Sequence, residues 1–438
     1  MLRRRLYDTL RYPLRRLGLS ESVKQLLGAR AVERIHARMF VSSELSRVLG
    51  GQRSAARADR GRPGRPTVRR PGLNVIGYLR AETGVGEGAR AVARALAAAG
   101  YPVAQIDLDG DWARAEDRSV MHLPVGSPHS INLLCVNADS TPQVIARVGA
   151  HVFVGKYNIG FWHWETANFP RQWHDRFAYF DEIWVGSGFV QKALSLVSPV
   201  PVVNVQLPVN ALLPSGCTRA ELGLPEEQFI FLFSFDMRSF AQRKNPHGLI
   251  EAYRRAFEPP LDRTALVIKL TNADVFPEET ERLRQAVAGV SGILIDRYLD
   301  RERLSGLFAL CDCYVSLHRG EGFGLTIAEA MALGKPVIAT AYSGNMEFMN
   351  PANSYLVGYR LDTIEGSYGP YQRGDEWAEP DIDHAAELMR LVVANSDDAA
   401  RKGARAAEDM RRFFSSEAVA RRMIGRLESI QRGRSDER

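Results

Sequence analysis

Cysteine is scarce in this chain, and long apolar runs are absent. The four cysteines, Cys135, Cys217, Cys311 and Cys313, are scattered over 438 residues, which argues against a disulfide framework and fits a reducing cytosol. Cys311 and Cys313 form a C-x-C pair in a predicted strand, where alternation places them on opposite faces, so we expect buried thiols rather than metal ligands. No run of about 18 apolar residues occurs, and a membrane span is therefore not expected.

Acidic residues are rare near the N-terminus, where basic residues gather instead. Residues 1–70 hold 18 Lys and Arg against 5 Asp and Glu, a net charge of +13, whereas the whole chain carries +6. The difference leaves residues 71–438 with about −7 and concentrates the excess basicity in the leader. The N-terminus also lacks the continuous apolar core of a signal peptide.

The basic leader has a helical pattern. Residues 1–48 show helical patterning: leucines recur every three or four residues from Leu2 to Leu17 with arginines between them, which predicts an amphipathic helix able to lie on an anionic membrane surface. A helix that packs on the body with a solvated arginine face is the alternative. Residues 50–72 are rich in Gly, Pro and Arg and predict a linker. Nucleic-acid binding by the leader is a further alternative, but interleaved aromatics are missing, so no nucleic-acid partner is expected.

Strands and helices alternate from Leu73 onward, which predicts an α/β protein with open, mostly parallel sheets. The pattern restarts near residue 229, so two Rossmann-like domains facing a cleft are expected. We predict a leader and linker over 1–72, domains over 73–208 and 209–400, and C-terminal helices over 401–438. The predicted strands are 73–78, 103–107, 130–136, 152–160, 182–186 and 202–205, then 229–235, 266–270, 293–296, 313–317 and 336–339.

A glycine-rich segment follows the first predicted strand. The run from Gly84 through Gly86 to Ala89 matches G-x-G-x-x-A, and Asp107 or Asp109 lies at the spacing of a ribose contact, as in NAD(P)-dependent oxidoreductases. Four residues separate the expected strand end from Gly84, however, which is longer than a dinucleotide-binding turn. We therefore favour a glycine loop that lets a substrate approach backbone N–H groups, with a turn that binds nothing as the alternative.

Aromatic residues surround a histidine and a glutamate after the fourth predicted strand. The segment Trp162-His163-Trp164-Glu165 places ring faces that can stack on sugars beside His163 and Glu165, either of which can accept a proton or a hydroxyl hydrogen bond. If the strand continues through Glu165, alternation puts His163 and Glu165 on the same side. A purely structural histidine is the alternative.

Basic residues follow the first strand of the second unit. Arg238, Arg243 and Lys244 can neutralise a diphosphate there, although solvated loop charges would have the same pattern. Asn245-Pro246 predicts the start of the next helix.

The most informative segment is EGFGLTIAE, residues 321–329. It follows a predicted buried strand and opens a helix that Gly334 should end. Backbone N–H groups at such a helix start can hold a phosphate. Glu329 falls two turns into the helix, and Glu321 stays in the loop, where it can reach a polyol. Farther on, a turn at Gly344 precedes Glu347, which can cap a helix start.

Together these motifs resemble the retaining glycosyltransferases of family 4, which have the two-Rossmann GT-B fold. The resemblance rests on Glu321 and Glu329 with Gly322, Phe323 and Gly324 between them, on the run AEAMALGKPVIAT, and on Gly344 and Glu347. It covers roughly Leu73 to the C-terminus and is strongest in the second half. In this fold the C-terminal helices cross back onto the first domain.

The resemblance implies roles for the candidate residues. Glu329 would hold the nucleotide ribose, and Glu321 with the backbone of Phe323, Gly324 and Leu325 would hold the donor sugar and phosphate. Arg238 and Lys244 would stabilise the leaving diphosphate, with Arg243 as the alternative to Arg238 because the Arg-to-Lys spacing departs from the usual one by a residue. His163 would lie near the reaction centre, with Glu165 as the alternative because the family's His-Asp pair is absent. The loop at Gly84 and Gly86 resembles the family's glycine loop in the first domain.

The predicted activity is transfer of a sugar from a nucleoside diphosphate sugar to the hydroxyl of a sugar or lipid-linked acceptor, in polysaccharide or glycolipid synthesis. Retention is implied by the family. No metal and no cofactor are expected, because Arg238, Lys244 and the helix start at 322–326 can stabilise the charge on the diphosphate. A cytoplasmic location, peripheral at the inner face of the membrane, would suit such an acceptor. An NAD(P)-dependent oxidoreductase is the main alternative.

Overall fold

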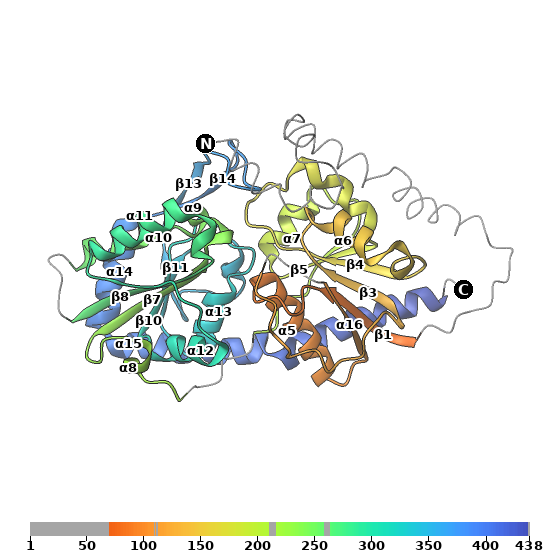
Figure 1. Cartoon of the computed structure of the whole chain (residues 1–438), viewed down its shortest axis with the longest axis horizontal. Coiled ribbons are helices and arrows are strands. Elements are labelled where there is room, and N and C mark those ends of the chain that lie inside the picture. Colours follow the sequence, from red (N-terminus) through yellow and green to blue (C-terminus); the bar gives the residue numbers. More distant parts are fainter. Residues whose placement is uncertain (1–69, 109, 111–112, 210–215, 258–262, 437–438) are drawn as a thin grey trace.

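The computed structural model describes residues 70–436 apart from 109, 111–112, 210–215 and 258–262. Within this part, two six-stranded parallel sheets form two units that lie next to each other (Figure 1). The predicted α/β fold with two Rossmann-like units is confirmed. The predicted leader helix and nearly all of the linker after it lie outside the described residues. None of the described helices is both long and apolar enough to cross a membrane.

The first sheet has the strand order β2-β1-β3-β4-β5-β6, with every neighbouring pair parallel. Its apolar runs are almost continuous because helices cover both faces, and Leu73, Val75 and Leu133 are fully buried. The order reverses beside β1, so the loops after β1 and β3 diverge and leave space at the sheet's carboxyl edge. The strands are β1 (Arg70–Gly77), β2 (Val103–Asp107), β3 (His129–Cys135), β4 (Tyr157–Phe161), β5 (Glu182–Val185) and β6 (Val202–Asn204).

Two predictions for the first unit are corrected. The strand predicted over 152–160 begins only at Tyr157, because Gly149 has a φ of +96° and a 3₁₀ turn over Ala150–Val152 precedes it. That strand also ends at Phe161, so it does not continue to Glu165, and alternation does not decide how His163 and Glu165 point.

The second sheet has the order β12-β11-β10-β7-β8-β9, again parallel throughout. Its switch point lies between β7 and β10, whose following loops carry the basic residues and the EGFG segment. Cys313 opens β10, but Cys311 ends the preceding helix, so the C-x-C pair does not share a strand; both thiols are free and buried. The strands are β7 (Phe229–Asp236), β8 (Thr264–Thr271), β9 (Ile293–Ile295), β10 (Cys313–Ser316), β11 (Val337–Thr340) and β12 (Tyr355–Val357).

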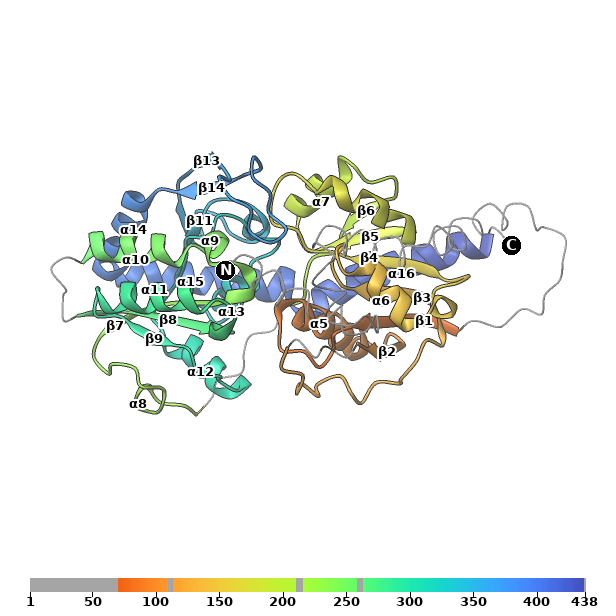
Figure 2. The same ribbon diagram turned by 45° about the horizontal axis from the view of Figure 1, so that its top comes forward.

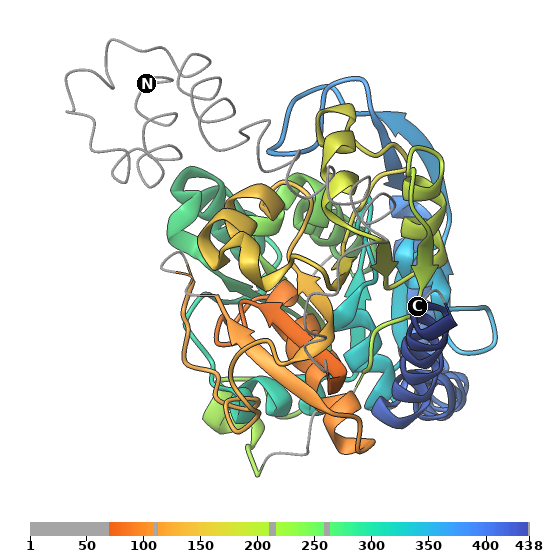
Figure 3. The same ribbon diagram turned by 90° about the vertical axis from the view of Figure 1, so that its right-hand side faces the viewer.

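Helices cover the sheets and connect the units. The last helix, α16 (Ser416–Asp436), packs against α5 (Gly84–Ala98) of the first unit, and Gln431 Nε2 donates to the Tyr101 hydroxyl at 3.0 Å. Figure 1 shows α16 running along the lower side of the first unit, Figure 2 shows it passing behind that unit, and Figure 3 looks onto the unit from its end. A π-turn over Met410–Phe414 separates α16 from the helix before it. The other α-helices of eight or more residues in the described part of the chain are α6 (Thr141–Val148), α7 (Gly188–Ser195), α10 (Pro246–Ala256), α11 (Pro277–Ala288), α12 (Arg301–Leu310), α13 (Leu325–Ala332), α14 (Ile382–Ala394) and α15 (Ser396–Asp409).

An antiparallel hairpin, β13 (Tyr359–Thr363) and β14 (Glu376–Pro380), follows the second sheet. Its buried residues Ile364, Tyr371 and Trp377 belong to an apolar cluster that otherwise comes mainly from the first unit and includes Trp164. The hairpin therefore ties the second unit to the first. The sequence pattern predicted no structure for this segment.

Candidate active site

A buried ion-pair cluster lies at the switch point of the second sheet. Glu321, which is 7% exposed, accepts a hydrogen bond from Lys244 Nζ, and its Oε2 lies 3.4 Å from an Arg243 guanidinium nitrogen. Both cations come from α9 (Ala241–Lys244), shortly after β7, and Glu321 comes from the loop after β10. The two loops that diverge at the switch point thus supply the two cations and their carboxylate.

The charges of this cluster stabilise one another. Burial alone would raise the pKa of Glu321, but Lys244 and Arg243 lower it to about 2, so the carboxylate is ionised at neutral pH. Burial lowers the pKa of Lys244, and the Glu321 carboxylate opposes that change. A second anion, such as a diphosphate, would compete with Glu321 for the same cations.

Arg238 belongs to a separate short turn that precedes α9. It sits in a 3₁₀ turn over Met237–Ser239 that Asp236 caps, with the Arg238 N–H donating to Asp236 Oδ1 at 2.9 Å. The residue that approaches Glu321 is Arg243, which also donates to the Gly320 carbonyl at 2.7 Å. The diphosphate role assigned to Arg238 stays a prediction.

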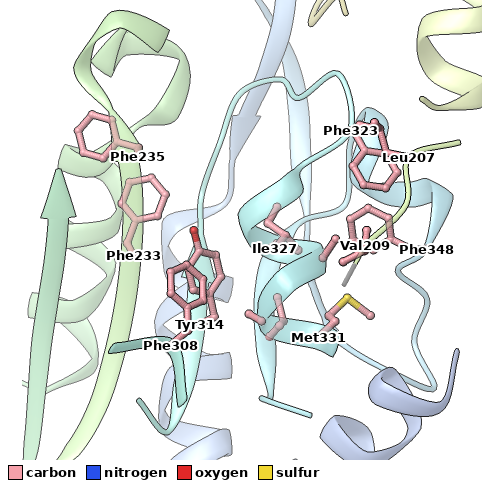
Figure 4. Packing of buried hydrophobic residues seen from close by; sticks show 14 of the residues in the cluster. Leu207, Val209, Phe233, Phe235, Phe308, Tyr314, Phe323, Ile327, Met331 and Phe348 are labelled. Carbon is pink, nitrogen blue, oxygen red and sulfur yellow. The ribbon is translucent and has the colours of Figure 1, made fainter. Parts of the chain in front are cut away.

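The loop before α13 presents backbone rather than side chains. Gly324 has a φ of +89° and forms the N-terminal cap of the helix, a conformation that glycine adopts without strain. Phe323 turns into an apolar cluster with Leu207, Val209 and Phe348, as Figure 4 shows. The N–H groups around Gly324 and Leu325 are therefore the groups of this loop that suit an anion.

Glu329 lines a cleft between the units. The lining of this cleft includes Glu87 and Arg94 of α5 and Arg301 of α12. Burial, together with the negative charge of Glu87, raises the pKa of Glu329 to about 8. Glu329 is therefore mostly protonated at neutral pH in the free protein.

The glycine motif of the first unit is the first turn of α5, so the prediction of a flexible loop was wrong. Gly84 opens the helix, and the Thr83 side chain caps it by accepting from the Gly86 N–H at 3.2 Å. A Cβ on Gly86 would lie 2.3 Å from the Ala81 carbonyl oxygen, so the tight turn requires glycine there. The ribose contact proposed for Asp107 is not supported, because its carboxylate pairs with Arg80; Asp109 lies outside the described residues.

His163 reaches the EGFG loop from the first unit. Its backbone N–H donates to Asn137 Oδ1 at 2.9 Å, which fixes the chain just beyond β4. A Cβ on Gly88 would lie 3.7 Å from His163 Nε2, and one on Gly322 would lie 3.6 Å from His163 Cβ. Burial lowers the pKa of His163 to about 4, so the imidazole is neutral at physiological pH.

Glu165 lies two residues after His163, where the same segment passes the EGFG loop. A Cβ on Gly320 would come within 2.3 Å of the Glu165 carbonyl oxygen, so glycine is needed where the two chains pass. The Tyr371 hydroxyl donates to Glu165 Oε2 at 3.0 Å. The structure thus brings His163, Glu165 and Glu321 together, with Arg243 and Lys244 behind Glu321.

Glu347 crosses between the units instead of capping its own helix. Its carboxylate accepts from the Gly188 N–H at 2.7 Å, at the start of α7, and from side chains of Asn204 at 2.9 Å and Gln206 at 2.8 Å. Nearby, the Ser187 hydroxyl donates to the Gly322 carbonyl at 2.6 Å. These contacts fix the EGFG loop and the turn after β11 against the first unit.

Several site residues escaped sequence reasoning. Ser187 and Tyr371 act on partners more than a hundred positions away, and no local pattern marks them. His318 had a weaker signal, as a histidine just after a buried strand; it is buried beneath Glu321 with Nε2 3.1 Å from Asn345 Oδ1. Within residues 70–436, gaps excepted, no group of three or more His, Cys, Asp or Glu is placed to hold a metal ion.

Comparison with known proteins bears on this geometry. Residues 217–362 match the family model described as "Glycosyl transferases group 1". The chain is 26% identical over 213 residues to a D-inositol 3-phosphate glycosyltransferase of Xylanimonas cellulosilytica, covering 48% of this chain and 45% of that protein. Another D-inositol 3-phosphate glycosyltransferase, from Nocardioides, is 27% identical over 242 residues, covering 52% and 48%. The chain thus spans about half the length of the curated relatives it matches.

Solved structures show the same fold. Anabaena Alr3699/HepE in complex with UDP and glucose has a TM-score of 0.61 at 13% identity, covering 82% of this chain and all of that one. Sucrose-phosphate synthase from Thermosynechococcus elongatus has a TM-score of 0.60 at 17% identity, covering 83% and all of that chain. At such identities the likeness establishes the arrangement of two Rossmann-like units and nothing finer.

Proposed function

We propose that this chain transfers a sugar from a nucleoside diphosphate sugar to an acceptor hydroxyl, because its residues 217–362 match the group 1 glycosyl transferases. The observation that carries the proposal is the buried cluster in which Lys244 and Arg243 share the Glu321 carboxylate. The cluster lies beside the start of α13, whose backbone N–H groups can donate hydrogen bonds. These N–H groups and the two cations suit a diphosphate, and the Glu321 carboxylate suits the hydroxyls of a sugar. Residues 73–208 would then hold the acceptor and residues 209–400 the donor.

The leaving diphosphate gains negative charge as the anomeric C–O bond breaks. Lys244 would move from Glu321 to a phosphate oxygen, and the N–H groups at Gly324 and Leu325 would bind the same group. Arg243 stays buried against Gly320 and would keep Glu321 ionised after Lys244 has moved. Glu321 is then available to accept hydroxyl hydrogen bonds from the donor sugar. Retention of configuration follows the family resemblance.

The acceptor side lies in the first unit. His163 is neutral, so its imidazole can accept or donate a hydrogen bond but brings no positive charge to the reaction centre. Glu329 lines the cleft together with Glu87, and we propose that it binds the nucleotide ribose there. The assignment of Glu329 to the ribose and His163 to the reaction centre rests on the resemblance together with these positions.

A panel of nucleotide sugars tests the proposal. UDP-glucose, UDP-N-acetylglucosamine, ADP-glucose and GDP-mannose are offered to the full chain, with thermal stabilisation and slow hydrolysis as readouts. We expect one donor class to stabilise and to be hydrolysed, and uridine donors are the first choice because Alr3699/HepE was solved with UDP. Lys244→Ala and Glu321→Ala should each lower turnover roughly 10²-fold or more, since the first removes a cation that stabilises the leaving diphosphate and the second removes the carboxylate that orients the donor sugar.

The matched control is Lys335→Ala. Lys335 is also a partly buried lysine in the second unit, but it donates to the Ala309 carbonyl, away from the cluster. If Lys244→Ala and Glu321→Ala stay within about twofold of the wild type, or if no nucleotide sugar binds, the proposal is wrong. NADH or NADPH fluorescence in the same screen would reveal an oxidoreductase instead.

We further propose that the acceptor is lipid-linked or part of a polysaccharide of the cell envelope, with the protein peripheral on the cytoplasmic membrane. The support is the net charge of +13 over residues 1–70 and the leucine spacing from Leu2 to Leu17. Sedimentation with phosphatidylglycerol vesicles tests it: the full chain should bind at low salt, and a chain that starts at residue 70 should not. Equal binding by both, or binding to duplex DNA alone, would contradict it.

A further inference from the structure

The hairpin β13–β14 brings a tyrosine into the site from beyond the region matched to the family. The match ends at residue 362, within β13, whereas Tyr371 lies in the loop that joins the two strands. Tyr371 is 3% exposed, and its hydroxyl donates to Glu165 Oε2 at 3.0 Å. A residue of the second unit thereby binds a candidate acceptor-side carboxylate of the first.

The ring of Tyr371 is as strongly constrained as its hydroxyl. It lies 5.7 Å from the Trp164 ring and 5.8 Å, edge to face, from the Phe240 ring. The Arg243 guanidinium carbon is 5.7 Å from the Tyr371 ring centroid, within the range of a cation–π contact. Tyr371 therefore contacts residues of both units at once, and its orientation is fixed by packing.

The two oxygens of the Glu165 carboxylate differ in their hydrogen bonds. Oε2 accepts from Tyr371, and among the described residues no hydrogen bond to Oε1 is found. Glu165 is half-buried, and its carbonyl group packs against Gly320, the residue before Glu321. A carboxylate oxygen without a protein donor, next to the loop that would read the donor sugar, suits a hydroxyl of a sugar substrate.

Arg243 connects Tyr371 and Glu165 to the buried ion-pair cluster. Its Nε has no hydrogen-bond partner although the side chain is only 4% exposed, so its position depends on the Gly320 carbonyl, Glu321 and the Tyr371 ring. Loss of the ring would leave one face of the guanidinium unsupported. Loss of the hydroxyl alone would free Glu165 and leave Arg243 in place.

We propose that Tyr371 is a positioning residue of the transfer site: its hydroxyl orients Glu165 so that Oε1 accepts a sugar hydroxyl, and its ring supports Arg243. The inference rests on the proposed function and extends it to a residue outside the family-matched region. The hydroxyl could belong to the donor sugar or to the acceptor, and both are the same chemistry at Oε1.

The test compares Tyr371→Phe with Tyr368→Phe. Tyr368 lies on the same hairpin, and its ring stacks on Trp377 at 5.9 Å instead of contacting Glu165, so its variant is the matched control. The probes are the donor that the wild type hydrolyses fastest in the panel above, its nucleoside diphosphate and its free sugar. Binding is measured by calorimetry, hydrolysis by kcat and KM, and folding by thermal melting.

Tyr371→Phe should leave the Kd of the nucleoside diphosphate within twofold, because the phosphates contact Lys244 and the EGFG loop. Its kcat/KM for hydrolysis should fall about tenfold, the value of one lost hydrogen bond of about 1.4 kcal/mol. Glu165→Gln should cause a similar loss, and the double variant should be no worse than Glu165→Gln alone, since both changes remove the same contact. Tyr371→Ala should additionally weaken diphosphate binding through Arg243.

The calorimetric binding measurements show whether the hydroxyl belongs to the donor or to the acceptor. If the hydroxyl belongs to the donor, Tyr371→Phe should reduce the difference in affinity between the nucleotide sugar and the nucleoside diphosphate. If the hydroxyl belongs to the acceptor, Tyr371→Phe should instead weaken binding of the free sugar in the presence of the diphosphate. The inference is overturned if Tyr371→Phe matches Tyr368→Phe, if its losses add to those of Glu165→Gln, or if diphosphate affinity falls as much as turnover. A wild type that hydrolyses no donor would instead refute the proposed function.

Discussion

The raised pKa of Glu329 predicts how strongly nucleotide binding depends on pH. Burial and Glu87 raise its pKa to about 8, so in the free protein about a tenth of the molecules carry the carboxylate at pH 7 and about nine tenths at pH 9. If the nucleotide ribose binds the ionised form, as the resemblance implies, binding must release a proton below pH 8. The affinity for the nucleoside diphosphate should then rise about tenfold between pH 7 and pH 9.

The perturbation is Glu329→Gln, which keeps the shape of the side chain and removes its titration. The assay is calorimetric titration of the nucleoside diphosphate at constant salt from pH 7 to pH 9, in two buffers of different ionisation enthalpy to count released protons. The wild type should tighten with pH and release close to one proton at pH 7. The variant should bind more weakly at pH 9 and show a flat profile, because its amide does not titrate.

The sign of the stability effect provides a check. The pKa of Glu329 is raised in the folded state, so the fold binds a proton that the unfolded chain releases above about pH 4.5. The free energy of unfolding of the wild type should therefore decline as pH rises from about 4.5 to 8, and Glu329→Gln should remove that part of the decline. A wild type whose affinity does not change with pH, or a variant with the same slope, would refute the reasoning.

Three further predictions concern the frame of the site. Glu347→Ala removes three hydrogen bonds between the units, so limited proteolysis should become faster and turnover should fall at least tenfold; a wild-type proteolysis rate would contradict the bridging role. Gly344→Ala should destabilise the protein by about 2–3 kcal/mol, since its Cβ would lie 2.2 Å from the Gly322 carbonyl oxygen, whereas Gly425→Ala, with nothing within 4 Å, should not lower the melting temperature. Arg426→Ala should destabilise by about 2–4 kcal/mol because it leaves the fully buried Glu182 carboxylate without its cation, and denaturant unfolding would measure the loss.

Much of the fold could be read from local pattern. Both sheets are covered by helices, so their strands appear as short apolar runs, and most predicted strands lie within a residue or two of their observed limits. The EGFG segment could be read for the same reason: glycine at a strand-to-helix turn is a local conformational demand, and Gly324 meets it with a φ of +89°. The start of the fourth strand was predicted wrongly because a 3₁₀ turn and a strand of similar apolar content look alike in sequence.

The arrangement of the site was only partly predictable. The sequence placed basic residues after β7 and carboxylates after β10, but it favoured Arg238 with Arg243 as the alternative, whereas the packing of α9 puts Arg243 beside Glu321. Glu347 was taken for a cap within its own segment, although the helix it caps is α7 of the other unit. Nothing in the chain near Tyr371 indicates Glu165 as its partner, because 206 positions separate them.

The sequence by itself therefore determined the two α/β units, the helix start at residues 321–329 and the family resemblance of the second unit, since each depends on residues within a few positions of one another. Only the tertiary structure decided which cations meet Glu321, that Glu329 shares a cleft with Glu87, and that a hairpin side chain holds Glu165. These contacts arise where two sheets place distant loops at one edge. Buried charges at such an edge are set by the neighbours that the fold brings to them, which local spacing does not encode.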